Sequence, residues 1–243
     1  TTSPLVWGDW VILEVGAATG NSMALDKRTG KQVWASQNTD PAGHTGGLAP
    51  ITVEGIACLA VLTHRNLLVL RTDRGHEGET VAEFPWVTEF ANSIASPAVH
   101  GDCVLITSGY NQHSICKLKI TLQGATELWR NDVCSKVCTP VIFDGHIYWS
   151  WRDVYCLDWE TGRTVWKGPS GLGDPGSCIV TADERLIVWS NEGTLLLMET
   201  AQRSPKRPQV LFRRDRIFRT DAWPHVVLAN GRLYGKDRDG NLK

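Results

Sequence analysis

Residues able to do chemistry are present in this chain, but their spacing matches none of the common catalytic or metal-binding patterns. The seven histidines lie singly, without the HxH or HExxH spacing of a zinc site, and no CxxC pair occurs. There is no GxSxG nucleophile motif, and the glycine-rich stretch 43–47 is too short and lacks the strand-to-helix switch of a phosphate loop. The motifs therefore predict no catalytic residue and no metal site.

An acidic turn near residue 240 shares part of a calcium-binding pattern. Asp237-Arg238-Asp239-Gly240 places two aspartates before a glycine, but the downstream glutamate and the other ligand positions are missing. We predict a turn before a last strand at this point. The nearby basic pairs at 206–207 and 213–214 are predicted to lie on a solvated outer face.

The cysteines do not indicate a disulfide framework. Their number is odd, and several lie inside apolar runs, where cysteine behaves as a small hydrophobic residue. One cross-strand bond, between Cys103 and Cys116, is left open. The seven residues are Cys58, Cys103, Cys116, Cys134, Cys138, Cys156 and Cys178.

The candidates for a binding site are six polar residues that stand just before short apolar runs. If these runs are the innermost strands of a ring of sheets, the six residues face the central axis. One interpretation is a polar funnel for a small anionic ligand or a metal. The other is a set of solvated loops, which we favour because channel linings are polar for solvation alone. The six are His44, Asn92, Lys136, Asp174, Arg219 and Asp221.

The overall composition limits the class of protein that can position these residues. The chain has 243 residues, a formal net charge of -1 and 42% hydrophobic residues, so it can bury a core but shows no electrostatic footprint for nucleic acid. No apolar run approaches the ~20 residues that span a bilayer. No signal peptide is visible, although the chain does not begin with Met, so processing or truncation could hide one.

A repeated eleven-residue phrase indicates the architecture. It reads ALDKRTGKQVW at 24–34 and CLDWETGRTVW at 156–166, with aspartate, threonine, glycine and tryptophan at the same offsets. A weaker third copy, KITLQGATELW, spans 119–129. Recurrence on a scale of tens of residues is typical of repeat proteins.

The same order of strands and turns surrounds each copy. Proline, or Cys178 in its place, begins successive units at 4, 50, 97, 140, 178 and 224, a spacing that fits one four-stranded propeller blade. Gly-Asp, Asp-Gly and Asn-Gly pairs between apolar runs are hairpin signals. Second strands are expected at 10–15, 56–62, 103–108, 146–149, 186–189 and 232–234, and third strands at 22–25, 67–70, 115–118, 154–157 and 195–198. Trp86 is expected to close the second unit, and Phe212 to replace the tryptophan in the fifth.

We therefore predict an all-β propeller of four-stranded antiparallel blades, with about six blades in one domain, 1–243. The blades are expected at 1–40, 41–90, 91–132, 133–170, 171–215 and 216–243, the last incomplete. In each phrase the aspartate accepts backbone N–H groups across a turn, the glycine takes a positive φ, and the tryptophan fills the wedge between blades. These residues are Asp26, Gly30, Trp34, Trp129, Asp158, Gly162 and Trp166.

The phrase AxDxxTGxxxW resembles the tryptophan-docking motif of the pyrroloquinoline-quinone (PQQ) repeat superfamily. That superfamily includes quinoprotein alcohol dehydrogenases and the propeller lipoprotein of the bacterial outer-membrane assembly machine. SPLVWGDWVILEVG, the FPW at 84–86 and VLANGRLYGKDRDGNLK are similar to planctomycete PQQ-like proteins that are labelled polyvinyl-alcohol dehydrogenases. The resemblance covers essentially the whole chain, and it implies an eight-bladed ring of which this chain is a part.

The resemblance implies two functions and a cellular location. The first function, which we favour, is a non-catalytic scaffold for protein or polymer partners, because no recognisable active-site set accompanies the repeats. The second is a PQQ-dependent oxidoreductase using Ca²⁺ and acting on alcohols, polyvinyl alcohol or sugars, although the adjacent cysteine pair of such enzymes is missing. A weaker third hypothesis is carbohydrate binding through Trp7, Trp151 and Trp159. By resemblance the protein is periplasmic or secreted, and open blade edges would allow self-association.

Overall fold

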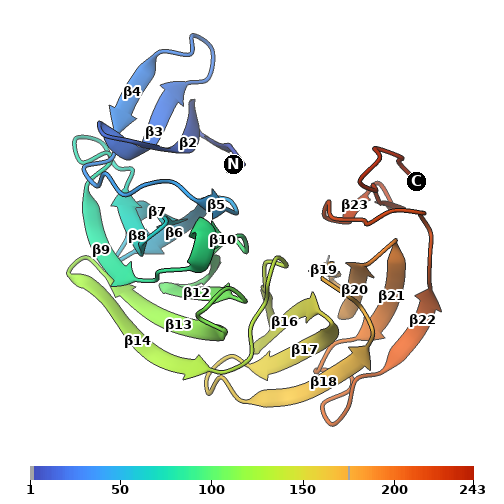
Figure 1. The fold of residues 1–243 in the computed structure, drawn as a ribbon. Helices are drawn as coiled ribbons and strands as arrows, with labels where there is room; N and C mark the ends of the chain where they lie inside the picture. Colours follow the sequence, from blue (N-terminus) through green and yellow to red (C-terminus); the bar gives the residue numbers. More distant parts are fainter. Residues whose placement is uncertain (1–2, 175) are drawn as a thin grey trace. The chain divides into compact units, whose positions relative to one another are not determined.

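The structure is a computed structural model that describes residues 3–174 and 176–243, and nearly all its regular structure is antiparallel β-sheet. The chain forms two compact units, residues 1–134 and 135–243. Among the described residues, three four-stranded sheets belong to the first unit and two to the second (Figure 1). Within each of these sheets the strands pair in chain order. The prediction of successive four-stranded antiparallel sheets is confirmed.

The first unit holds three four-stranded sheets and one small parallel pair. Its first sheet is β1 (Leu5–Trp7), β2 (Trp10–Ala17), β3 (Gly20–Asp26) and β4 (Gln32–Ala35). Its second is β6 (Ala49–Val53), β7 (Ile56–Leu62), β8 (Asn66–Arg71) and β9 (Thr80–Pro85). Its third is β11 (Ala98–His100), β12 (Cys103–Ser108), β13 (Ser114–Thr121) and β14 (Gly124–Asn131). The parallel pair is β5 (His44–Thr45) with β10 (Asn92–Ser93), and a short 3₁₀ turn, η1 (Glu89–Ala91), precedes β10.

The second unit holds two four-stranded sheets and a hairpin. Its first sheet is β15 (Val141–Phe143), β16 (His146–Trp151), β17 (Asp153–Asp158) and β18 (Thr164–Ser170). Its second is β19 (Gly176–Val180), β20 (Arg185–Ser190), β21 (Thr194–Glu199) and β22 (Val210–Arg214). The hairpin is β23 (Val227–Ala229) with β24 (Arg232–Tyr234).

The strands lie where the apolar runs and turn pairs predicted them. β7, β12 and β24 coincide with the predicted ranges, and the other second and third strands are longer than predicted by two to four residues. The turns explain this accuracy, because a two-residue hairpin with positive φ at both positions fixes the strands on either side. Glu54 and Gly55 have φ values of 49° and 83°, and Asn230 and Gly231 have 50° and 72°.

A β-bulge recurs between the third and fourth strands of all five four-stranded sheets. In the first sheet Trp34 lies opposite Ala24, whereas Gln32 lies opposite Leu25, so that Val33 has no partner. A bulge of this kind bends the outer strand and increases its twist. The unpaired residues are Val33, Val81, Leu128, Val165 and Leu211.

The bulge also distinguishes the second sheet from the other four. The position that follows the unpaired residue is Trp34, Trp129, Trp166 or Phe212 in four sheets, but it is Ala82 in the second sheet. Trp86, which was expected to close that unit, lies beyond the end of β9. It is fully buried, and the Arg130 guanidinium lies 5.1 Å from its ring centroid.

Apolar cores form where neighbouring sheets of the first unit face one another. Trp34 packs in one cluster with Leu59 and Leu68 of the second sheet. A second cluster joins the second sheet to the third and includes Val69 and Ile106. Each such cluster removes several large side chains from water, at about 1.5–3 kcal/mol for a fully buried Leu or Ile. The sheets of this unit are therefore held together by apolar packing between their faces.

The turn in each repeated phrase is fixed by its aspartate. Asp26 accepts the amide and the hydroxyl of Thr29 at 2.7 and 2.8 Å, and Asp158 accepts the same groups of Thr161, both at 2.7 Å. These hydrogen bonds lower the pKa of both carboxyl groups. The glycine after each threonine has φ of 69° or 68°, a region that an L-residue enters only at a cost.

The cross-strand disulfide that the sequence left open is not formed. All seven cysteines are free and buried. In the β12–β13 pair Cys103 lies opposite Lys119 and Cys116 lies opposite Ile106, so the two cysteines are three positions out of register. Disulfide formation requires Cβ atoms about 4 Å apart. The register of the hairpin, which the sequence did not determine, places them too far apart for this bond.

Candidate functional site

The structure places the six polar candidates two by two in three different parts of the chain. His44 and Asn92 are register partners in the β5–β10 pair. With Thr45 and Ile94 they line an open hollow of about 360 Å³ in the first unit. An imidazole and an amide can each donate or accept hydrogen bonds.

A buried polar network lies in the first unit and extends from the residue after His44. The Thr45 hydroxyl donates to the Glu14 carboxylate, and the Asn21 amide donates to Glu14 at 3.2 Å and to the Asp40 carbonyl at 2.9 Å. The Asp40 carboxylate accepts hydrogen bonds from two further side chains, Thr63 at 2.9 Å and Asn66 at 2.7 Å. These buried groups are bonded to one another, which fixes the loops around the hollow.

Sequence reasoning missed this network, although one signal was present. Glu14 interrupts the apolar run of β2 at a position whose side chain is only 8% exposed. A carboxylate at an inward position of a strand needs buried partners, so its presence predicts polar residues nearby. The identity of those partners depends on long-range contacts that the pattern alone does not give.

Lys136 and Asp174 form an ion pair in the second unit. The Lys136 ammonium donates to the Asp174 carboxylate at 2.5 Å, and the Trp151 indole N–H donates to the same carboxylate at 3.0 Å. Partial burial acts to raise the pKa of Asp174, but these two hydrogen bonds and the Lys136 charge outweigh it, and the pKa is lowered. The charges of this pair therefore neutralise each other and bind a loop to the end of β16.

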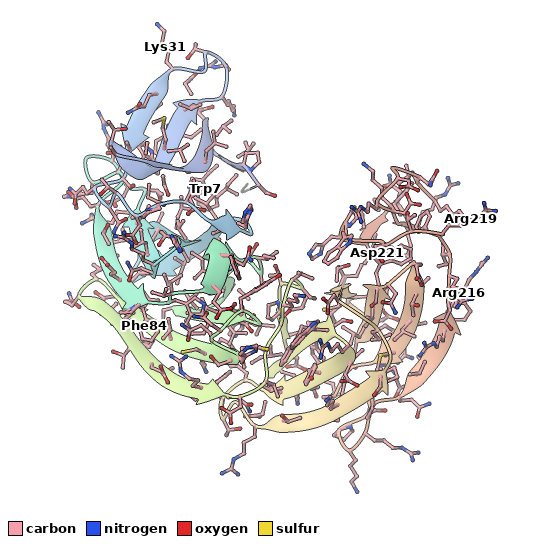
Figure 2. The ribbon with its side chains drawn as sticks, in the orientation of Figure 1. Trp7, Lys31, Phe84, Arg216, Arg219 and Asp221 are labelled. Atoms are coloured by element: carbon pink, nitrogen blue, oxygen red, sulfur yellow. The ribbon has the colours of Figure 1, made fainter. Side chains whose placement is uncertain are left out.

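Arg219 and Asp221 lie in the connection between β22 and β23. Both line an open hollow of about 470 Å³ together with Glu192 and Arg238. Arg219 also lines a larger hollow of about 710 Å³ with Arg216 and Phe218. Figure 2 shows Arg216 and Arg219 extending from the same stretch of chain into solvent. Arg219 is exposed, Asp221 is half-buried, and the two side chains carry opposite formal charges.

The acidic turn at 237–240 is closed by its own hydrogen bonds. The Asp237 carboxylate accepts the Asn241 amide at 2.7 Å, the Asn241 side chain at 2.8 Å and the Thr220 hydroxyl at 3.1 Å. These donors act against burial and lower the pKa of Asp237. Within residues 3–174 and 176–243, no group of three or more His, Cys, Asp or Glu side chains could hold a metal ion.

The donor sets beside His44 and at Asp174 do not fit PQQ with Ca²⁺. Calcium takes six to eight oxygen ligands, usually including several carboxylates. The Asp174 carboxylate is already engaged by Lys136 and Trp151, and the hollow beside His44 has no acidic residue in its lining. We therefore derive no redox step from this part of the chain.

The three tryptophans expected to bind carbohydrate are not all accessible. Trp159 is only 5% exposed, so the prediction that it presents an exposed ring was wrong. The face of Trp151 is covered by the Arg152 guanidinium at 4.9 Å. Trp159 follows Asp158 directly, and its backbone amide donates to Gly145, which turns the side chain into the sheet. Trp7 remains partly exposed.

The most exposed aromatic side chain in the structure was not predicted from the sequence. Phe90, in the connection between β9 and β10, is 83% exposed, and Val87 beside it is 50% exposed. Phe90 has φ 53° and ψ 24°, a left-handed conformation that is unusual for a bulky residue. No periodic pattern marks a single aromatic residue in a loop, so the sequence carried no signal for it.

Comparisons with known proteins agree with this architecture. A crystal structure of BamB from Moraxella catarrhalis matches 98% of this chain and 67% of its own, with a TM-score of 0.68 and 18% identity. A crystal structure of the mitotic checkpoint complex matches 97% of this chain and 70% of its own, with a TM-score of 0.67 and 10% identity. No curated protein sequence matches the chain significantly. The likeness to these structures shows a β-propeller fold.

A family model matches a large part of the sequence itself. The model described as outer membrane protein assembly factor BamB matches residues 1–168, which is more than half of the chain. Across the described residues, no helical segment has the length and apolar character needed to cross a bilayer. The chain belongs to the outer membrane protein assembly factor BamB family.

Proposed function

We propose that this chain is a non-catalytic β-propeller scaffold that binds protein partners during the assembly of outer-membrane proteins. The observation that carries the proposal is the family match over residues 1–168. The site geometry supports it, because Lys136 and Asp174 neutralise each other and the buried carboxylates near the other hollow are bonded internally. A location in the periplasm or at the outer membrane follows from the same family.

We also propose that the repeated phrase acts by tryptophan docking within one propeller. Trp34 and Trp166 are 7% and 5% exposed, and Trp34 packs against the next sheet. Each sheet would then be a blade with the bounds 1–40, 41–90, 91–132, 133–170, 171–215 and 216–243. Rigid blades would hold the connecting loops in fixed positions, which is how many repeat scaffolds present binding surfaces.

Binding to the assembly machinery tests the scaffold function. The purified chain would be mixed with the detergent-solubilised outer-membrane assembly complex of the same organism and separated by size-exclusion chromatography. We expect the two to co-elute at a fixed ratio. Separate elution across micromolar concentrations of both would contradict the proposal.

A PQQ titration tests the alternative of an oxidoreductase acting on alcohols, polyvinyl alcohol or sugars. PQQ and Ca²⁺ would be added to the intact protein while quinone absorbance and dye-linked alcohol oxidation are followed. We expect neither saturable binding nor turnover. Binding of one equivalent of PQQ together with turnover would contradict the scaffold function and show that the protein is an oxidoreductase.

A further inference from the structure

One connection in the first unit exposes apolar side chains that its own fold does not bury. Residues 87–92 join β9 to β10, and within them Phe90 is 83% exposed and Val87 is 50% exposed. By contrast, Trp86 directly before them is fully buried. Aromatic side chains are enriched at the centres of protein–protein interfaces and among the residues that contribute most to binding.

The backbone of this connection is held in a strained conformation. Phe90 has φ 53° within a turn that is closed by the Asn92 amide donating to the Glu89 carbonyl. An aromatic residue pays for this conformation, whereas asparagine or glycine would adopt it readily. Because Phe90 is exposed, this conformation does not serve to bury its side chain. Strained residues of this kind occur often at functional sites.

Hydrogen bonds from the neighbouring β12–β13 turn fix this connection in place. The Gln112 side chain donates to the Val87 carbonyl at 2.6 Å, and the Glu89 amide donates to the Asn111 side chain at 3.2 Å. The Ser108 hydroxyl donates to the Asn92 carbonyl at 3.4 Å. Phe90 is therefore presented on a preorganised loop, and little ordering entropy would be lost when it binds.

We propose that residues 87–92 form a docking surface in which Phe90 enters an uncharged apolar pocket of a folded protein partner. This proposal rests on the proposed scaffold function, and it identifies Phe90 as a residue that would contact the protein partner. Glu89 is the one formally charged residue in the stretch, so the partner needs no opposing charge cluster. The amides of Asn111 and Gln112 are already engaged within the loop, which leaves the phenyl ring as the main contact.

A lipid surface is a poorer occupant for this loop. Segments that bind membrane interfaces combine aromatic residues with Lys or Arg that meet anionic head groups. The sequence VTEFAN at 87–92 has no basic residue and carries one acidic residue. A preformed pocket on a protein therefore fits the surface better than a bilayer does.

The test compares two substitutions that each remove one exposed phenyl ring. Phe90→Asn keeps a residue that tolerates positive φ, so the loop conformation should survive. Phe212→Thr is the matched control, because Phe212 is 50% exposed on β22, a different surface. Affinity for the detergent-solubilised outer-membrane assembly complex would be measured by biolayer interferometry at low and at high salt. Sedimentation with phosphatidylethanolamine–phosphatidylglycerol vesicles would be the second arm.

We expect Phe90→Asn to weaken binding by roughly 30-fold, as for an aromatic hot spot, and Phe212→Thr to leave it unchanged. Binding should change little with salt, because no charge cluster contributes. If the wild type binds and Phe90→Asn binds equally well, or if both variants lose binding alike, the docking surface is wrong although the scaffold function stands. If the wild type does not bind, the scaffold function fails and the surface with it. Vesicle binding that depends on Phe90 would overturn the protein partner in favour of lipid.

Discussion

The hydroxyl oxygen of Tyr148 accepts the backbone amide of Ala201 at 2.9 Å, and both residues are buried. The bond joins β16 to the turn after β21, so it links the two four-stranded sheets of the second unit. Tyr148 also lies 5.9 Å from Trp166 between ring centroids, on the same sheet. A second polar bond lies nearby, since the Gln202 side chain donates to the Asp144 carbonyl at 2.9 Å. These bonds help to fix how the two sheets meet.

Removing the Tyr148 hydroxyl should destabilise the protein measurably. Tyr148→Phe leaves the Ala201 amide buried without an acceptor, which costs about 1–3 kcal/mol. For a domain of this size each kcal/mol lowers Tm by roughly 2–4 °C, which scanning calorimetry would detect. Tyr234→Phe on the half-buried β24 is the control and should leave Tm unchanged. Equal Tm values for the wild type and Tyr148→Phe would show that this bond does not contribute.

Two aromatic residues at equivalent positions of the bulge should differ strongly in their contribution to stability. Trp34→Ala removes a residue that is 7% exposed and should lower the free energy of unfolding by about 3–5 kcal/mol. Phe212→Ala removes one that is 50% exposed and should cost less than about 1 kcal/mol. Urea unfolding of both variants measures the difference. Similar losses of unfolding free energy in the two variants would contradict this prediction. They would mean that the position in the repeat, and not burial, determines how much the residue stabilises the protein.

The Lys136–Asp174 pair should stabilise the protein only above the range in which Asp174 is protonated. Its folded-state pKa is lowered relative to the unfolded state, so its contribution is complete above about pH 4 and disappears as the pH falls through the folded-state pKa. Because both side chains are partly exposed, we expect Lys136→Gln to cost at most about 1 kcal/mol at neutral pH. Unfolding free energies from neutral pH to about pH 3 should show the wild type and the variant converging. Lys206→Gln is the surface control, and a difference that stays constant with pH would contradict the assignment.

All seven cysteines should be reduced in the folded protein and slow to react, because all seven side chains are buried. Burial raises the pKa of Cys58 to about 11 and that of Cys116 and Cys156 to about 12, so little thiolate forms at mildly alkaline pH. Ellman's reagent should react slowly with the native protein. After unfolding in guanidinium without reductant, it should titrate seven thiols. Two missing equivalents in the unfolded protein would reveal a disulfide.

The sequence predicted the strands well because its turns are local. Asn230, Gly231 and Gly55 are residues suited to positive φ, so these hairpins could be placed without knowing any distant contact. The register of the outer strands was harder to predict from the sequence. Trp86 directly follows β9, but the residue after the bulge in that sheet is Ala82. The position of a bulge depends on pairing across the sheet and not on the phrase alone.

The candidate site was predicted only in part. His44 and Asn92 are register partners, and Lys136 and Asp174 form an ion pair, so residues before the inner strands do meet in pairs. The sequence did not show that the charge of Lys136 is neutralised, since that depends on a residue 38 positions away. Phe90 was missed for a different reason: exposure and backbone strain have no sequence pattern.

The most direct test of a non-catalytic scaffold is sedimentation velocity of the fluorescently labelled chain, alone and with the outer-membrane assembly complex of the same organism. The account predicts that all of the label moves with the complex at a fixed ratio, and that added PQQ and Ca²⁺ change nothing. A chain that sediments alone at every concentration of the complex, yet binds one equivalent of PQQ with alcohol turnover, would contradict it.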